Sequence, residues 1–124
     1  MSDRVVHFEI PYDDGDRARA FYGEAFGWDL QSWPEGEYTL VTTGPTGESG
    51  ASEPGFINGG MMKREAPFGS PVIVIAVDDI DASLATVERL GGTSIVAKQP
   101  VGDMGWAAYF KDPDGNLMGL FQNA

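Results

Sequence analysis

The sequence predicts an α+β fold in which a strand, a helix and three further strands (a βαβββ module) occur twice in one chain. Three observations predict this. An apolar strand runs through a paired aspartate into an amphipathic helix near the start of the chain, and the same order returns later. Asp13-Asp14 recurs as Asp78-Asp79, 65 residues later, and a glycine follows each helix. Three strand-like segments follow each of the two helices.

The first module begins with "VVHFEI", in which apolar residues alternate with polar ones. The expected inward face, assigned to the core, is Val6, Phe8 and Ile10, and the opposite face carries Val5, His7 and Glu9. The helix that follows has one apolar stripe, formed by Ala18, Phe21, Tyr22, Ala25 and Phe26. Asp14 or Asp16 can cap its first turn, and Gly27 suits a left-handed residue after its last turn.

The segments "WDLQSW", "EYTLVTT" and "FINGGMMK" are expected strands, with a turn at Pro34-Glu35-Gly36 and a flexible loop over residues 44–55. The second module begins with "VIVIAV" and continues with a helix whose apolar residues are Ile80, Leu84, Val87 and Leu90. The strands "TSIVAK", "WAAYFKD" and "NLMGLFQ" complete it, and "DPDGN" before the last strand is a turn. We therefore expect one domain over residues 1–124, with modules at about 1–66 and about 70–124.

Composition limits the classes of function. The chain has 124 residues and no cysteine, which excludes disulfides, thiolate chemistry and zinc–cysteine sites. Its net charge of −11 repels phosphate backbones and anionic lipids, so we expect neither nucleic acid nor membranes as partners. The first residues contain no cationic segment that leads into a long apolar run, and a cytoplasmic location is expected.

A module whose sheet is covered by a helix on one face only must bury the other face or use it as a concave cavity. The segments "HFEIPYDD", "RARAFYGEAFGW" and "FKDPDGNLMGLFQ", together with the duplicated order of elements, resemble the vicinal oxygen chelate superfamily. This superfamily contains glyoxalase I, bleomycin resistance proteins and extradiol dioxygenases. The resemblance implies paired βαβββ modules that form a cupped mixed sheet, and a homodimer.

The resemblance also implies where a metal ion would be held. Metal-dependent members use four side chains, from the first and last strands of each module. In this sequence His7 occupies the first of these positions, whereas Val72 and Gly119 occupy two positions of the second module. The remaining position falls within residues 55–59, where Asn58 is the only polar side chain. One imidazole does not reach the three protein ligands of a catalytic zinc site, so no metal site or other cofactor is expected.

The favoured interpretation is a protein that binds a small, largely aromatic or apolar molecule in the cup. The residues expected to contact the ligand are His7, Glu9, Trp33, Tyr38, Asn58, Trp106 and Phe121. Two alternatives stay open, so enzyme activity is not decided. One is a lyase, isomerase or oxygenase that uses His7 and a divalent Zn, Ni, Fe or Mn ion. The other is a metal-free enzyme that uses His7 and Glu9 as an acid/base pair.

Overall fold

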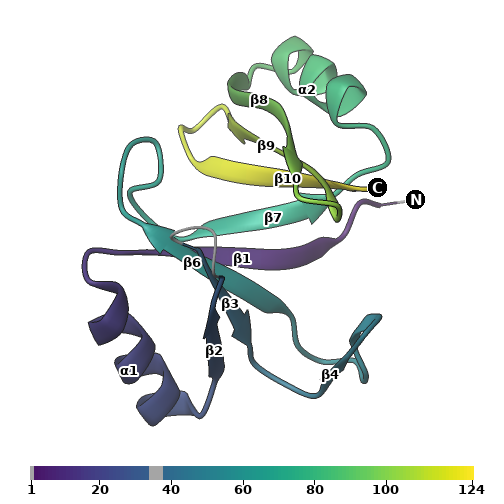
Figure 1. Cartoon of the computed structure of the whole chain (residues 1–124). Coiled ribbons are helices and arrows are strands. Elements are labelled where there is room, and N and C mark those ends of the chain that lie inside the picture. Colours follow the sequence, from purple (N-terminus) through teal and green to yellow (C-terminus); the bar gives the residue numbers. More distant parts are fainter. Residues whose placement is uncertain (1, 34–37) are drawn as a thin grey trace. The chain divides into compact units, whose positions relative to one another are not determined.

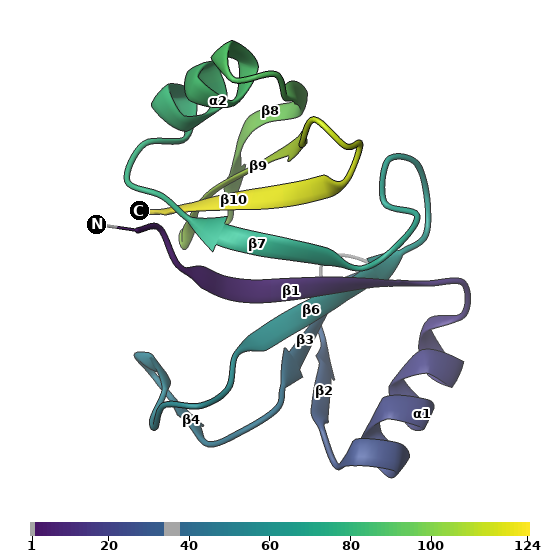
Figure 2. The same ribbon diagram turned by 180° about the vertical axis from the view of Figure 1, so that it is seen from behind.

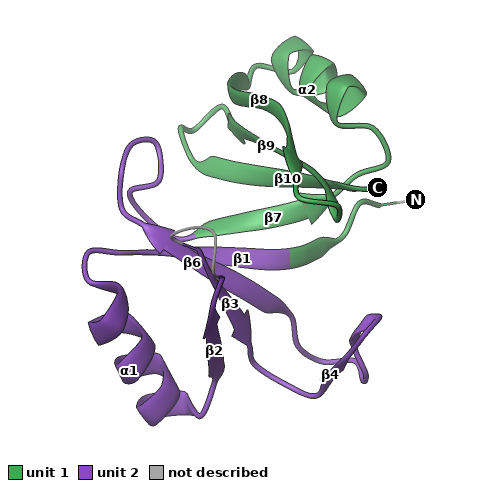
Figure 3. Ribbon diagram, in the orientation of Figure 1, with its two compact units in different colours: residues 1–6, 72–124 green, residues 7–71 purple. Residues whose placement is uncertain are grey.

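The computed structural model describes residues 2–33 and 38–124, so the predicted turn at Pro34-Glu35-Gly36 lies outside the described residues. The chain divides into two compact units (Figure 3). Unit 1 contains residues 1–6 and 72–124, and unit 2 contains residues 7–71. Each unit has a helix and a mixed sheet, which confirms the predicted α+β class and the two βαβββ modules. No helix in the described chain is long and apolar enough to cross a membrane.

Unit 2 is built from most of β1 (Val5–Tyr12), α1 (Gly15–Phe26), β2 (Asp29–Ser32), β3 (Tyr38–Thr42) and β6 (Asn58–Lys63). Its strands follow the order β2, β3, β6, β1, in which β1 and β6 are parallel and the other pairs are antiparallel (Figure 1). The expected flexible loop at 44–55 instead carries a small hairpin, β4 (Thr46–Gly47) with β5 (Gly50–Ala51).

Both ends of α1 follow the prediction. The Asp14 side chain accepts a hydrogen bond from the Arg17 backbone N–H at 3.1 Å, and Gly27 has a left-handed φ of 72°. The apolar stripe, however, does not enter a core, because Phe21 and Phe26 are 57% and 62% exposed. Their rings pack on each other and on Tyr22, whose ring stacks on Trp28 at 5.1 Å.

The buried layer of unit 2 lies on the opposite side of its sheet from His7 and Glu9. It is formed by Thr39, Val41 and Met61, none of which is more than 1% exposed. Arg19 of α1 donates a hydrogen bond to the Thr39 hydroxyl at 3.0 Å, which ties the helix to this layer. Val6, assigned to the core by its alternation, is 40% exposed because it precedes His7, the first residue of β1 that pairs with β6.

Unit 1 is built from β7 (Val72–Ala76), α2 (Ile80–Arg89), β8 (Thr93–Val101), β9 (Gly105–Lys111) and β10 (Leu117–Asn123). Its strand order is β7, β10, β9, β8, with β7 parallel to β10. Helix α2 packs against β8, β9 and β10, as can be followed in Figure 2. The core of this unit consists of Ile80, Leu84, Ala108, Phe110 and Leu120.

The start of α2 and the turn before β10 also follow the sequence. Asp79 caps α2 by accepting a hydrogen bond from the Ala82 N–H at 3.1 Å. In the "DPDGN" turn, Gly115 has a φ of 87°, and the Asp112 carboxylate accepts bonds from the N–H groups of Asp114 and Asn116. The Asn116 side-chain amide also donates a hydrogen bond to Asp112, at 3.0 Å. This bond has the largest effect, and together with the backbone hydrogen bonds it lowers the pKa of Asp112.

Candidate functional site

Three polar side chains meet on one face of the sheet of unit 2. In the parallel pair of β1 and β6, Glu9 lies opposite Gly60, and in the antiparallel pair of β6 and β3, Gly60 lies opposite Leu40. His7 and Glu9 are two residues apart on β1, and Tyr38 and Leu40 are two residues apart on β3. Since alternate residues of a strand share a face, all of these side chains belong to the same side of the sheet.

Tyr38 joins the two polar residues of β1. Its hydroxyl lies 2.9 Å from Nε2 of His7, and it donates a hydrogen bond to Oε2 of Glu9 at 2.9 Å. The hydroxyl has a single proton, so when that proton points to Glu9 the His7 contact requires a proton on Nε2. A neutral His7 then keeps its lone pair on Nδ1. The three side chains, named here the His7–Tyr38–Glu9 trio, form one directed chain of donors that ends at a carboxylate.

The electrostatic environment of the trio favours the neutral form of the His7 imidazole. Burial lowers the pKa of His7 below its ordinary value of 6.5, and the nearby Glu9 carboxylate raises it, with burial the larger effect. Glu9 is only 5% exposed. A buried carboxylate needs hydrogen-bond donors, and the Tyr38 hydroxyl supplies one of them.

Gly60 makes room for this arrangement. A Cβ atom placed on Gly60 would lie 1.8 Å from the Tyr38 hydroxyl oxygen and 2.1 Å from the ring carbon that carries it. Real atoms do not approach so closely, so Tyr38 can reach Glu9 and His7 only because residue 60 has no side chain.

Gly60 is also the counterpart of Gly119. In unit 1 the parallel pair of β7 and β10 places Gly119 opposite Val74, as β1 and β6 place Gly60 opposite Glu9. Val74 lies 65 residues after Glu9, which is the spacing of the repeat in the sequence. By this correspondence of registers, the last-strand ligand position that the resemblance implies for the first module falls on residue 60, next to the expected range 55–59.

At Gly119, too, an aromatic ring occupies the neighbouring space. A Cβ atom there would lie 3.0 Å from a methyl group of Val74 and 3.2 Å from the ring of Tyr109. Each of the two positions at which the resemblance implies a metal ligand on a last strand is thus a glycine beside a tyrosine.

The donor set therefore does not fit the metal ion of the superfamily. His7 is the one matching ligand, and Val72 is an aliphatic residue that is 1% exposed. Within the described residues, no group of three or more His, Cys, Asp or Glu side chains could hold a metal ion. The Nε2 atom of His7 is already engaged with Tyr38.

Asn58, another residue expected at the site, serves the hairpin at 46–51. Its side-chain oxygen accepts a hydrogen bond from the Thr43 N–H, and its amide nitrogen donates one to the Thr46 hydroxyl, both at 2.9 Å. Trp33 is half-buried just before the undescribed segment. Trp106 and Phe121 belong to unit 1, whereas the His7–Tyr38–Glu9 trio belongs to unit 2, so their place at the site stays a prediction.

Leu40 and Met62 were not anticipated as site residues. Both share the face of the trio, because Leu40 pairs with Gly60 and Met62 pairs with Tyr38 and Pro11. Leu40 is 36% exposed, which leaves apolar surface available next to the polar groups. Their alternation with Tyr38 and Gly60 is visible in the sequence, but the register that brings the strands together is not.

Two cationic side chains of unit 2, Arg19 and Arg64, pair with carboxylates other than Glu9. Nε of Arg64 lies 2.9 Å from the Asp13 carboxylate, and the same guanidinium donates to the backbone oxygen of Gly69. Arg19 pairs with Asp16 at 2.7 Å and binds Thr39 on the helix side of the sheet. These pairings do not favour an anionic ligand at the trio.

Comparisons with known proteins give relatives over the whole chain. Residues 4–44 match the family described as bleomycin resistance protein-like N-terminal. A probable lactoylglutathione lyase of Vibrio parahaemolyticus serotype O3:K6 is 34% identical over 125 residues, which cover 97% of this chain and 91% of the relative.

Solved structures share the fold. A glyoxalase/bleomycin resistance protein/dioxygenase superfamily member from Vibrio splendidus 12B01 aligns with a TM-score of 0.64 and 19% identity, over 99% of this chain and 100% of its own. A methylmalonyl-CoA epimerase in complex with methylmalonyl-CoA aligns with a TM-score of 0.68 and 20% identity, over 100% of this chain and 96% of its own.

Proposed function

Because the chain belongs to the glyoxalase/bleomycin resistance/dioxygenase (vicinal oxygen chelate) superfamily, we propose that it binds a small, largely aromatic or apolar molecule at the His7–Tyr38–Glu9 trio without a metal ion. The observation that carries this proposal is the position of Tyr38, whose hydroxyl bonds both His7 and Glu9 across the space above Gly60. A carboxylate ligand at residue 60 would need that same space.

The chemistry of the face supports a ligand with one polar end. His7 and Tyr38 provide hydrogen-bonding groups, while Leu40 and Met62 provide apolar surface next to them. Few polar groups beside an apolar wall are typical of small-molecule sites. The engaged arginines and the net charge of −11 argue for a neutral or cationic ligand.

Two measurements test the binding proposal. Metal analysis of protein purified without added metal should find far less than one ion per chain, and stoichiometric Zn, Ni, Fe or Mn would contradict the metal-free proposal. A thermal-shift screen against aromatic antibiotics, catechols and hemithioacetals should raise the Tm with at least one class. The shift should be lost in Leu40→Asp and retained in Leu90→Asp, a matched change at a residue of unit 1 that is 66% exposed. Absence of a shift from every class would contradict binding.

A second candidate is a metal-free enzyme in which His7 and Glu9 act as an acid/base pair. The specific observation in its favour is the continuous hydrogen-bonded chain through Tyr38, since a neutral imidazole with a lowered pKa can accept a proton near neutral pH. Incubation of a bound carbonyl compound in D₂O tests it. Deuterium should enter the carbon next to the carbonyl with wild-type protein and not with His7→Gln, and exchange equal to a buffer blank would exclude this activity for that compound.

The proposal also includes the homodimer that the resemblance implies and the cytoplasmic location expected from the first residues of the sequence. Sedimentation of the purified chain at micromolar concentration should give the mass of two chains, about twice 13.3 kDa. A mass of one chain at every concentration would exclude the dimer.

A further inference from the structure

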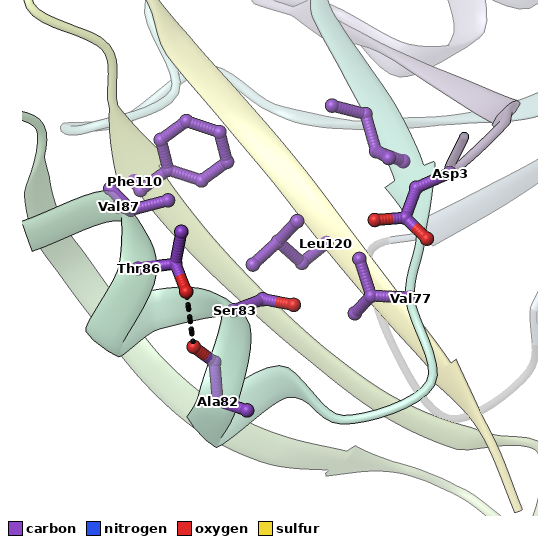
Figure 4. Close-up of a pocket in the computed structure, with 9 residues that line it drawn as sticks. Asp3, Val77, Ala82, Ser83, Thr86, Val87, Phe110 and Leu120 are labelled. Carbon is purple, nitrogen blue, oxygen red and sulfur yellow. Dashed lines mark hydrogen bonds between the residues drawn. The ribbon is translucent and has the colours of Figure 1, made fainter. Parts of the chain in front are cut away.

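A cavity that is open to solvent lies wholly within unit 1, between α2 and the strands β7, β9 and β10. Its volume is about 360 Å³, and Figure 4 shows residues that line it. It is lined by Asp3, Ile75, Val77, Ala82, Ser83, Thr86, Val87, Phe110 and Leu120. The volume is at the lower end of the range of small-molecule sites and corresponds to a ligand of about ten non-hydrogen atoms.

This cavity is on the helix-covered face of the sheet. Leu120, which is 3% exposed, points into it, whereas its neighbour Gly119 belongs to the opposite face, beside Tyr109. The cavity is therefore on the opposite face of this unit's own sheet from Gly119. Its floor is made of aliphatic side chains and one aromatic ring, and these side chains extend the hydrophobic core of the unit.

The polar groups of the cavity are one carboxylate and two hydroxyls. The Asp3 carboxylate and the Ser83 hydroxyl lie around Val77 and Leu120 in Figure 4. No hydrogen bond of the Ser83 hydroxyl occurs within the described residues, although the side chain is half-buried. The Thr86 hydroxyl donates its proton to the Ala82 backbone oxygen at 3.1 Å and can therefore only accept a further bond.

The segment that carries Asp3 is held in place. The Arg4 backbone oxygen accepts a hydrogen bond from the Ala76 N–H of β7 at 2.9 Å, which fixes the residue next to Asp3 against the sheet. None of the described residues that line the cavity is Lys, Arg or His. The cavity thus combines an apolar floor with one negative charge at Asp3, the Ser83 hydroxyl, which can donate or accept, and the Thr86 hydroxyl, which can accept.

We propose that the cavity between α2 and the sheet of unit 1 binds a small organic amine, with its aromatic or branched aliphatic body on the apolar floor and its ammonium group near Asp3 and Ser83. Ammonium is a donor with three N–H groups and suits acceptors that have spare lone pairs. A carboxylate or phosphate ligand is disfavoured by Asp3 and by the net charge of −11.

The test compares three probes of nearly the same shape, 2-phenylethylamine, 2-phenylethanol and 3-phenylpropanoate, by NMR titration of the ¹⁵N-labelled full chain. The amine should shift amide signals of α2, β7 and β10, with a Kd of about 1–10 mM, as expected for a ligand of this size. It should bind about two- to fivefold more tightly than the alcohol, because Asp3 is exposed and its pairing with the ammonium is weak. The carboxylate should bind most weakly.

Two variants with matched controls complete the test. Asp3→Asn should abolish the preference for the amine, whereas Asp103→Asn, in the turn between β8 and β9, should preserve it. Ser83→Leu should fill the cavity and weaken all probes more than tenfold, whereas Ala85→Leu, on the exposed side of α2, should not.

Three outcomes would overturn the proposal. The first is equal binding of the amine and the alcohol, and the second is amide shifts confined to the surroundings of His7. The third is no binding of any probe at about 10 mM, which is at the upper end of the expected range of Kd. Because amide signals of unit 1 and of the surroundings of His7 are read separately, failure here would not affect the proposal for the His7–Tyr38–Glu9 trio, and failure at the trio would not affect this one.

Discussion

Replacing Tyr38 with Phe removes one oxygen atom and with it the bonds that join the trio. In the structure that oxygen lies 2.9 Å from His7 Nε2 and 2.9 Å from Glu9 Oε2, and Glu9 is 5% exposed. Removing one hydrogen-bond partner from a buried polar group costs about 1–3 kcal/mol. We expect Tyr38→Phe to lower the free energy of unfolding by this amount, and the Tm by about 4 °C for each kcal/mol.

Urea unfolding at neutral pH measures the loss, and Tyr22→Phe is the matched control. The Tyr22 ring stacks on Trp28 at an interplanar angle of 5°, and its hydroxyl makes no hydrogen bond within the described residues. Its replacement should change the free energy of unfolding by less than about 0.5 kcal/mol. If the two variants lose the same amount, the Tyr38 hydroxyl does not support Glu9, and the argument for a built site is refuted.

Three further predictions follow from the same contacts. Gly60→Ala should destabilise the protein more than Gly119→Ala, because the new Cβ atom would lie 1.8 Å rather than 3.0 Å from its nearest neighbour. Much of the cost of Gly60→Ala should disappear in a chain that already carries Tyr38→Ala. Urea unfolding of the three single variants and of the Gly60→Ala/Tyr38→Ala double variant checks this. Burial lowers the pKa of His7 in the folded chain, so as the pH falls below 6.5 the imidazole is protonated in the unfolded chain before it is protonated in the folded chain. The contribution of His7 to the free energy of unfolding should therefore be full above pH 6.5 and be lost as the pH falls toward the lowered pKa of the folded chain. His7→Gln should therefore narrow the difference in unfolding free energy between about pH 7.5 and about pH 5.5, and an unchanged difference would contradict the shift. Asp79→Ala should cost about 1 kcal/mol in urea unfolding through loss of the cap of α2, and Asp79→Asn, which keeps an acceptor, should cost much less.

Local patterns in the sequence predicted the elements of the fold. The order of strands and helices, the cap at Asp14 and the "DPDGN" turn depend on residues a few positions apart, and the structure confirms them. The exposure of Phe21 and Phe26 was not predictable in this way. Their stripe has the period of a buried helix face, but only packing in three dimensions decides whether the stripe meets the sheet or other aromatic rings.

The centre of the candidate site depended on strand register. Tyr38 lies 31 residues from His7 and 29 residues from Glu9 in the sequence, and it meets them only because β3 and β1 both pair with β6 around Gly60. A shift of one residue in either pairing would place the tyrosine on the other face. The sequence therefore identified His7 and Glu9 as a candidate pair and Tyr38 as a separate candidate, but it could not show that Tyr38 joins the pair in one hydrogen-bonded unit.

The two glycines connect the fold to the chemistry that the site can carry. A carboxylate on residue 60 and the Tyr38 ring require the same volume, so the last strand can present either a metal ligand or a glycine covered by tyrosine. This chain has the second arrangement at Gly60, and at Gly119 the ring of Tyr109 lies within 3.2 Å of the corresponding position. The Nε2 atom of His7 lies 2.9 Å from the tyrosine hydroxyl, so this ring nitrogen is engaged in a hydrogen bond with Tyr38. Where the resemblance implies two metal ligands, this chain has two glycines beside tyrosine rings, and the hydrogen-bonded His7–Tyr38–Glu9 trio therefore supports the proposed recognition or proton transfer.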